Sequence, residues 1–164
     1  MVKNVKLDAI DLRILAQIQA NARITNVLLA DTVGLSPSPC LQRLKRLEKA
    51  GLIRRYHGEV DLVKLAGVTF VFTEITLGGH RKEDFLKFER AIAQEPTVLE
   101  CHCVSGGFDY LVKFAVRHIG HYQEIFDALL AAEIGIVKYF SYIVLKTTLE
   151  PRAPDLSLYL QAST

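Results

Sequence analysis

The chain has 164 residues, half of them hydrophobic, and a formal net charge of +2. This length suits one domain or two small ones and supplies enough apolar side chains for a core. Three cysteines do not make a disulfide framework, the first residues lack the apolar core of a signal peptide, and no apolar run approaches the roughly 20 residues of a membrane span. We therefore expect a cytoplasmic protein with no membrane partner.

The charge is distributed unevenly along the chain. Residues 1–60 contain ten Lys or Arg and five Asp or Glu, a net charge of +5, whereas residues 61–164 have a net charge of −3. A basic first third followed by a mildly acidic remainder predicts a polyanion-binding module joined to a second module.

Two short helices are predicted before residue 34. Asp8 is a good N-cap for the first, with Asp11 at the capping-box position, and Thr25 is a good N-cap for the second. The side chains expected to point inward are Ile10, Ile14, Leu15 and Ile18 on the first helix and Leu28, Leu29 and Val33 on the second.

A third helix is predicted between the Ser-Pro pairs and Gly51, although the pattern does not decide which pair starts it. Its predicted apolar side carries Cys40, Leu41, Leu44 and Leu47, and the other side is cationic with amide and hydroxyl groups. Together with the preceding helix and its Gly34 turn, it forms a predicted helix-turn-helix. A polar, cationic face suits a DNA major groove, and a solvated basic face on an ordinary helix is the alternative.

Residues 52–60 are predicted to be extended with a turn near Gly58, forming a basic strand pair, or wing, beside the three helices. Gln42 and Arg46 are expected to contact base edges, and Lys45, Lys49, Arg54 and Arg55 to contact phosphates. Ordinary surface charge is the alternative interpretation of Arg54 and Arg55. The complete predicted interface with double-stranded DNA consists of Ser36, Ser38, Gln42, Arg43, Lys45, Arg46, Lys49, Arg54 and Arg55.

The remaining chain predicts an α+β domain. After a linker helix at 61–67, strands are expected at 68–77, 98–104, 110–116 and 136–149, with helices at 83–95 and 121–133. This βαββαβ order is ferredoxin-like, with both helices on one face of an antiparallel sheet. We thus expect a DNA-binding domain at 1–60, a linker at 61–67, a ferredoxin-like domain at 68–150 and a tail at 151–164, which could be docked or loose.

The last predicted strand has apolar side chains on both faces. Tyr139, Ile143 and Leu145 alternate with Phe140 and Tyr142, so neither face is polar. An exposed apolar sheet face is expected to mark an interface, and we therefore predict a homo-oligomer.

The residue pattern resembles the Lrp/AsnC, or feast/famine, family of transcriptional regulators. The resemblance spans about residues 7–150 and depends on Asp8–Leu15, Ala22-Arg23, Gly34–Cys40 with the basic residues that follow, and the turn carrying Gly106 and Asp109. It implies an amino-acid-responsive regulator with a winged helix-turn-helix, dimerising through its sheets and assembling from dimers to octamers. Two features depart from the family pattern: Glu133-Ile134-Gly135 stands where Pro-Gly is common, and the tail is long.

The predicted turn between the second and third strands is the candidate effector site. Backbone N–H groups of a Gly-rich turn suit the carboxylate of an amino acid, and Asp109 suits its ammonium group. The alternative is a hairpin turn that uses Gly and Asp for its own geometry. The resemblance implies a site between dimers that is formed by Ser105, Gly106, Gly107, Phe108, Asp109 and Tyr110.

We expect no metal, cofactor or enzymatic activity. On a strand, Cys101 and Cys103 share one face and His102 points to the other, so the three cannot converge on one ion, and the cysteines are expected to be buried. No convergent nucleophile, base and acid can be identified. Two further functional hypotheses are an architectural DNA-wrapping protein with weak sequence preference and a cytosolic ferredoxin-like enzyme or binding module.

Overall fold

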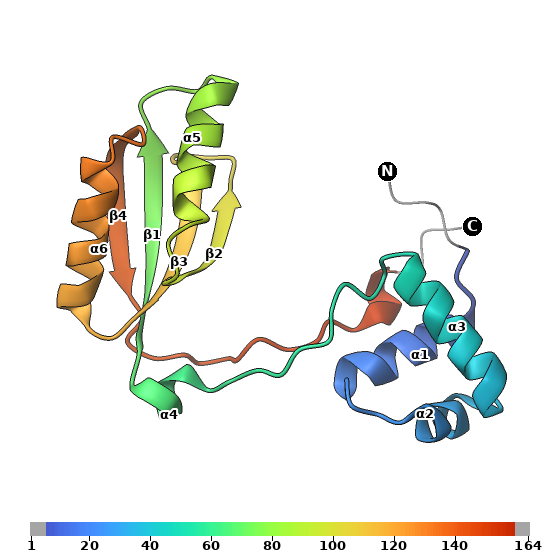
Figure 1. Ribbon diagram of the computed structural model, residues 1–164. Helices are drawn as coiled ribbons and strands as arrows, with labels where there is room; N and C mark the ends of the chain where they lie inside the picture. Colours follow the sequence, from blue (N-terminus) through green and yellow to red (C-terminus); the bar gives the residue numbers. More distant parts are fainter. Residues whose placement is uncertain (1–5, 160–164) are drawn as a thin grey trace. The chain divides into compact units, whose positions relative to one another are not determined.

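The computed structural model describes residues 6–159, which divide into two compact units (Figure 1). The first unit contains the described residues up to Glu59 together with those from Glu150 onward, and the second is Val60–Leu149. Each unit has its own cluster of buried apolar side chains. The tail after the sheet domain therefore belongs to the same unit as the N-terminal helices.

Three helices form the first unit: α1 (Ala9–Ala20), α2 (Asn26–Val33) and α3 (Pro37–Lys49). The predicted capping box is confirmed, because Asp8 accepts from the N–H of Asp11 while the Asp11 carboxylate accepts from the N–H of Asp8. Gly34 is left-handed with φ of 76°, which turns the chain sharply between α2 and α3. The core of the unit consists of Ile14, Ile18, Leu29, Ala30, Val33, Cys40 and Leu47.

The structure settles where the third helix begins. Ser36 is the N-cap and Pro37 the first helical residue, and Gly51 follows the helix with φ of 75°. One inward prediction on α2 is wrong, since the side chain of Leu28 is 53% exposed. Leu29, Ala30 and Val33 form the buried face of α2, because an eight-residue helix packed against two neighbours buries only a narrow stripe.

The predicted strand pair at residues 52–60 does not form in the structure. The segment contains no strand, and its described residues are mostly exposed. Two short strands with no third strand or apolar face to cover them are only marginally stable. Instead, the Tyr56 hydroxyl donates to Glu48 Oε1 at 2.7 Å and ties the segment to the end of α3.

The tail forms a short 3-10 turn at Leu156–Tyr159 that contacts α1. The side chain of Leu156 is partly buried there, whereas Leu158 is 74% exposed. The sequence left open whether the tail is docked or loose, and the structure shows the turn at Leu156–Tyr159 in contact with α1, whereas residues 151–155 are exposed.

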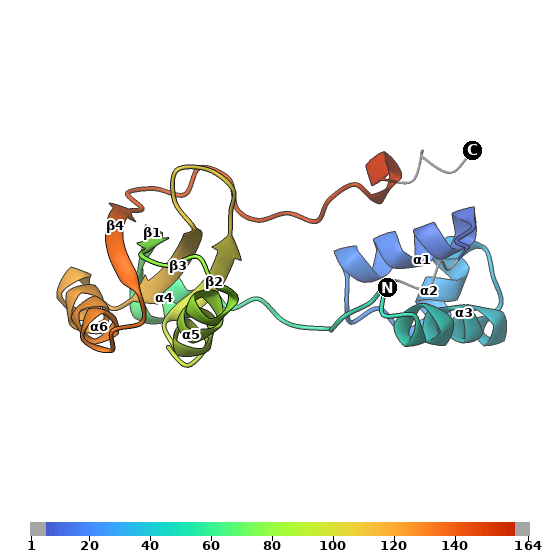
Figure 2. The same cartoon turned by 90° about the horizontal axis from the view of Figure 1, so that it is seen from above.

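The second unit confirms the predicted βαββαβ order. A short helix α4 (Leu62–Ala66) precedes β1 (Thr69–Leu77), α5 (Lys82–Ile92), β2 (Val98–Cys103), β3 (Tyr110–Val116), α6 (Ile119–Ala131) and β4 (Ile136–Ile143). The four strands pair antiparallel in the order β2-β3-β1-β4. Figure 2 shows α5 and α6 on the same face of this sheet.

The core of the second unit lies between the sheet and these two helices. Phe88 of α5 stacks on Tyr110 of β3 with ring centroids 4.5 Å apart, and Phe126 of α6 stacks on Tyr139 of β4 at 4.2 Å. The buried Tyr122 hydroxyl lies 2.8 Å from Thr73 Oγ1 and 2.6 Å from Ser141 Oγ, so its hydrogen-bonding capacity is satisfied.

The register decides which residues of β4 face the helices. Because Ser141 and Tyr139 contact α6, the alternate residues Phe140 and Tyr142 lie on the open face, where they are 52% and 51% exposed. Ile143 pairs with Val71 on the helix face. The strand ends at Ile143 rather than at the predicted residue 149. Val144 still donates to Phe70, but β1 begins at Thr69, so residues after Leu145 have no strand to pair with.

Candidate functional site

The exposed face of α3 carries most of the side chains that the sequence predicts to bind DNA. Ser38, Gln42, Lys45 and Lys49 are exposed, and no hydrogen bond or ion pair within residues 6–159 involves their side chains. The opposite face is anchored in the core by Cys40 and Leu47, both fully buried. These four residues of the predicted polar face are therefore all accessible to solvent. Ser36 is also exposed, but its hydroxyl accepts no N–H at the helix start.

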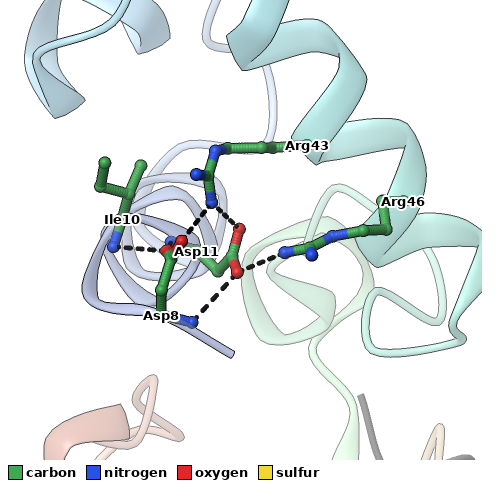
Figure 3. Close-up of polar contacts among 5 residues, drawn as sticks. All are labelled: Asp8, Ile10, Asp11, Arg43 and Arg46. Atoms are coloured by element: carbon green, nitrogen blue, oxygen red, sulfur yellow. Dashed lines mark hydrogen bonds and ion pairs between the residues drawn. The ribbon is translucent and has the colours of Figure 1, made fainter. Parts of the chain in front are cut away.

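Arg43 and Arg46 behave differently from their neighbours on α3. Both guanidinium groups reach back to α1, where Arg43 Nη1 lies 2.9 Å from Asp11 Oδ1 and Arg46 Nη2 donates to Asp11 Oδ2 (Figure 3). Arg43 Nη1 also lies 2.6 Å from Asp8 Oδ2. The structure thus separates these two arginines from the remaining predicted DNA-binding residues, although Arg46 is still 49% exposed.

The acidic partners are well suited to hold these cations. The backbone N–H of Asp11 and the guanidinium of Arg43 lower the pKa of Asp8 to about 2, so Asp8 is ionised at neutral pH. The sequence identified Asp8 and Asp11 only as helix caps. Their spacing of three residues matches that of Arg43 and Arg46, which is the signal that could have predicted the pairing.

Arg54 and Arg55 are exposed beside the C-terminal end of α3. They directly precede Tyr56, whose hydroxyl donates a hydrogen bond to Glu48 of α3. Burial and the Glu48 carboxylate raise the pKa of Tyr56 to about 12, so the phenol remains a donor at neutral pH. The two arginines are therefore exposed just before a residue that is tied to α3, without any strand pairing.

The predicted effector turn has free backbone donors. Ser105–Gly107 are exposed, and no hydrogen bond described within residues 6–159 uses the N–H groups of Ser105–Phe108. Gly106 has φ of 146°, a conformation that favours glycine. Phe108 is partly buried and closes the turn. The turn therefore offers exposed donors next to a partly apolar wall.

Asp109 is already engaged by its own chain. Its Oδ2 accepts from the N–H of Leu77 at 2.7 Å, and its Oδ1 lies 3.0 Å from His80 Nε2. Since each carboxylate oxygen has two lone pairs, the group retains acceptor capacity, and its side chain is 17% exposed. The sequence did not predict the His80 contact, because the loop after β1 carries no signal that relates it to the β2–β3 turn.

Tyr110, the last predicted effector residue, lies in the core. It is 1% exposed, stacks on Phe88 and donates from its hydroxyl to Glu89 Oε1 at 2.8 Å. Burial, assisted by Glu89, raises the pKa of Tyr110. The Tyr110 side chain therefore packs in the core next to the turn and does not line the exposed side of the turn.

The cysteines and other possible ligands do not form a metal site in the described part of the chain. No group of three His, Cys, Asp or Glu side chains is arranged to hold an ion there. Cys101 packs against the core, and burial raises the pKa of its thiol to about 11. Cys103, predicted to be buried, is exposed, because it lies at the end of the edge strand β2.

Two family models match the two units of the chain. A model described as winged helix-turn-helix DNA-binding matches residues 7–54, and a model described as the Lrp/AsnC ligand binding domain matches residues 70–154. The chain belongs to the Lrp/AsnC family of transcriptional regulators. The winged helix-turn-helix assignment of the first unit is thereby confirmed at the level of the family, although the wing segment forms no strands here.

Curated relatives support the same conclusion over nearly the whole chain. The transcriptional regulatory protein DoeX of Halomonas elongata is 44% identical over 148 residues, which cover 90% of this chain and 94% of that protein. The leucine-responsive regulatory protein of Haemophilus influenzae is 40% identical over 144 residues, covering 88% and 87%. These relatives favour a DNA-binding transcriptional regulator over an architectural DNA-wrapping protein.

Solved structures match the fold. An AsnC family transcriptional regulator from Agrobacterium tumefaciens has a TM-score of 0.87 at 29% identity, covering 94% of this chain and all of that one. A transcriptional regulator from Neisseria meningitidis, solved in complex with L-Met, has a TM-score of 0.85 at 31% identity, covering 93% and 99%. None of the helices described here is long and apolar enough to cross a membrane.

Proposed function

We propose that this regulator reads its operator with the exposed face of α3. Ser36, Ser38 and Gln42 supply hydroxyl and amide groups for bases and backbone, and Lys45, Lys49, Arg54 and Arg55 supply charge for phosphates. The observation that carries the proposal is that this face is exposed, cationic and unpaired, while Cys40 and Leu47 anchor the helix behind it. Arg43 and Arg46 contribute through the donors left by their ion pairs.

Footprinting tests this proposal directly. A short protected site with two-fold related halves is expected, because a dimer presents two copies of α3 to adjacent turns of the groove. Periodic protection over long tracts would instead indicate the architectural alternative. Absence of binding to any duplex at low salt would contradict both, since phosphate contacts are strongest there.

We further propose that the effector is an amino acid bound at the turn Ser105–Asp109. The free N–H groups of Ser105–Phe108 suit a carboxylate, the remaining acceptor capacity of Asp109 suits an ammonium group, and Phe108 provides an apolar wall. The Neisseria meningitidis regulator in complex with L-Met supports this ligand class. Repeating the footprint with a panel of amino acids identifies the ligand, and no change with any of them would contradict the proposal.

We also propose that a second copy of the chain covers the open face of the sheet, and that dimers assemble further, up to octamers. Phe72 lies between Tyr142 of β4 and Lys113 of β3 on this face, and Phe140 faces Glu74. A largely aromatic face of this kind, half-exposed in one chain, is typical of a homodimer interface. The proposed location is the cytoplasm, where such a regulator meets chromosomal DNA.

Two lysine substitutions on opposite faces of β4 test the dimer. Tyr142→Lys adds a charge to the open face, so the sedimentation of the protein is expected to change to that of a monomer. Ile143→Lys, at a position with similar exposure but on the helix face, is expected to lower the melting temperature and leave the dimer intact. A monomeric parent at micromolar concentration would contradict the proposal.

A further inference from the structure

Asp11 is the one buried charged side chain among residues 6–159. Burial of a carboxylate costs free energy unless cations and hydrogen bonds compensate it, and an apolar residue of similar size often packs as well or better. Ile14, Leu29 and Leu47 already supply the packing of this unit. The carboxylate of Asp11 therefore does something that an apolar side chain at the same place cannot do.

Its two oxygens join the first helix to the DNA-binding helix. Oδ1 accepts from Arg43 and Oδ2 accepts from Arg46, 32 and 35 residues further along the chain (Figure 3). Oδ2 also accepts from the N–H of Asp8 at 3.1 Å, which holds the carboxylate at the start of α1. One buried group thus sets the position of two guanidinium groups on α3.

Each guanidinium carries five N–H donors in a rigid plane, and these ion pairs use only a part of them. Arg46 donates to Asp11 from Nη2 and remains 49% exposed, whereas Arg43 is more enclosed at 29%. A guanidinium fixed on one side and exposed on the other has few conformations left to lose when it meets DNA.

We propose that Asp11 is a positioning residue for DNA recognition. It holds Arg46 and Arg43 so that their free donors meet the operator in a defined geometry. This inference rests on the proposed DNA-binding role of α3. It assigns to Asp11 no contact with DNA. It also explains why a residue that caps α1 is placed directly beneath the DNA-binding helix.

The same contacts change the electrostatics of the interface. Asp8 and Asp11 offset the charges of Arg43 and Arg46, so non-specific attraction to phosphate comes from Lys45, Lys49, Arg54 and Arg55. Removing the Asp11 charge releases Arg46 to move and to contact any phosphate. We therefore expect the loss of Asp11 to strengthen non-specific binding while weakening discrimination, a combination that simple destabilisation does not produce.

The test uses the full chain and two duplexes of equal length. One is the duplex that the parent protein enriches from a random-sequence library, and the other is its scrambled version. Fluorescence anisotropy gives the affinities between about 50 and 200 mM salt. For Asp11→Asn we expect the affinity ratio of the two duplexes to fall about tenfold or more. The salt slope, which is the change in the logarithm of affinity with the logarithm of salt concentration, is expected to steepen on the scrambled duplex by about 0.9 for each arginine released.

Two further variants keep the test decisive. Asp31→Asn makes the same charge change on α2 at an exposed residue with no contact to either arginine, and it is expected to preserve the parent's ratio and slope. Arg46→Lys keeps the charge but loses the planar fork, so a lower ratio with an unchanged slope is expected. This variant decides the question if Asp11→Asn does not fold.

The outcomes separate this inference from the proposed function. A folded Asp11→Asn protein with the ratio and slope of the parent overturns the inference, as does Arg46→Lys with the ratio of the parent. A parent that binds no duplex overturns the proposed function and this inference together. A parent that prefers its selected duplex, with unaffected variants, overturns this inference alone.

Discussion

Asp109 has one observed task and one proposed task in the effector turn, and one substitution can separate them. Its Oδ2 accepts from the backbone N–H of Leu77, while the negative charge of the carboxylate is proposed to meet the ammonium group of the ligand. Asp109→Asn retains an oxygen acceptor for Leu77 but removes the charge. Asp109→Ala removes both. We expect the first variant to lose ligand affinity at nearly unchanged stability, and the second to lose both.

The magnitudes follow from the environment of the hydrogen bond. Leu77 is 2% exposed, so Asp109→Ala leaves a buried N–H without a partner, at a cost of about 2 kcal/mol. For a unit of this size, spanning Val60–Leu149, that cost lowers the melting temperature by about 8–16 °C. Loss of a charge-assisted hydrogen bond to the ligand, worth about 1.5–3 kcal/mol, weakens binding by about 10-fold to 150-fold in both variants.

Two measurements check this expectation. Scanning calorimetry of the full-length variants reports stability, and isothermal titration with the amino acid identified by footprinting reports affinity. His80→Gln is the control, because it removes the ring beside Oδ1 but leaves both the charge of Asp109 and its bond to Leu77. If Asp109→Asn binds the ligand as tightly as the parent, the ammonium partner lies elsewhere and Asp109 is a turn residue only.

Three further predictions concern the DNA-binding unit. Folding lowers the pKa of Asp8 from 3.8 to about 2, so the stabilising contribution of its carboxylate is complete above about pH 4 and is lost as the pH falls through 2. In thermal melts, the melting temperature of Asp8→Asn is therefore expected to fall less between pH 4 and pH 2 than that of the parent. Gln42→Ala is expected to relax preference at one or two base pairs by roughly 1–3 kcal/mol, whereas Arg54→Ala weakens binding to all sequences and flattens the salt slope by about one unit. Equal loss of preference in both would contradict this division. Leu156→Ala is expected to destabilise the first unit by about 1 kcal/mol, measured by denaturant unfolding, and the exposed Leu158→Ala to leave it unchanged.

Much of the fold could be predicted because its signals are local. Asp8, Thr25 and Gly34 specify helix starts and a turn through their own hydrogen bonds and backbone angles, and the structure confirms each of them. The alternation of β3 and the stripe of α5 also follow from periodicities that do not depend on distant residues. The exposed face of α3 could be predicted for the same reason.

The features that could not be predicted depend on contacts between distant segments. The sequence places Arg46 on the polar side of α3, but only the packing of α1 against α3 reveals that Asp11 lies within reach. Likewise, His80 meets Asp109 only because β1 and β3 are neighbours in the sheet. Leu28 was misplaced because apolar character alone does not show which of two adjacent leucines a short helix buries.

The connectivity of the chain limits how an effector can act on DNA binding. The turn at Ser105–Asp109 leads directly into β3, whose Leu111 and Lys113 lie on the open face of the sheet, so the proposed ligand and the proposed second copy bind the same strand. A ligand shifts an equilibrium only by its differential affinity for the two states, and a coupling of about 1–3 kcal/mol suffices for regulation. If the states are assemblies, the sedimentation coefficient changes when ligand is added, together with operator affinity, because linked DNA-binding units gain from effective concentration. If operator affinity changes while sedimentation does not, the ligand acts without changing the number of copies, and its effect reaches the DNA-binding units through a rearrangement within the assembly or through the two segments that join the units before Leu62 and after Ile143.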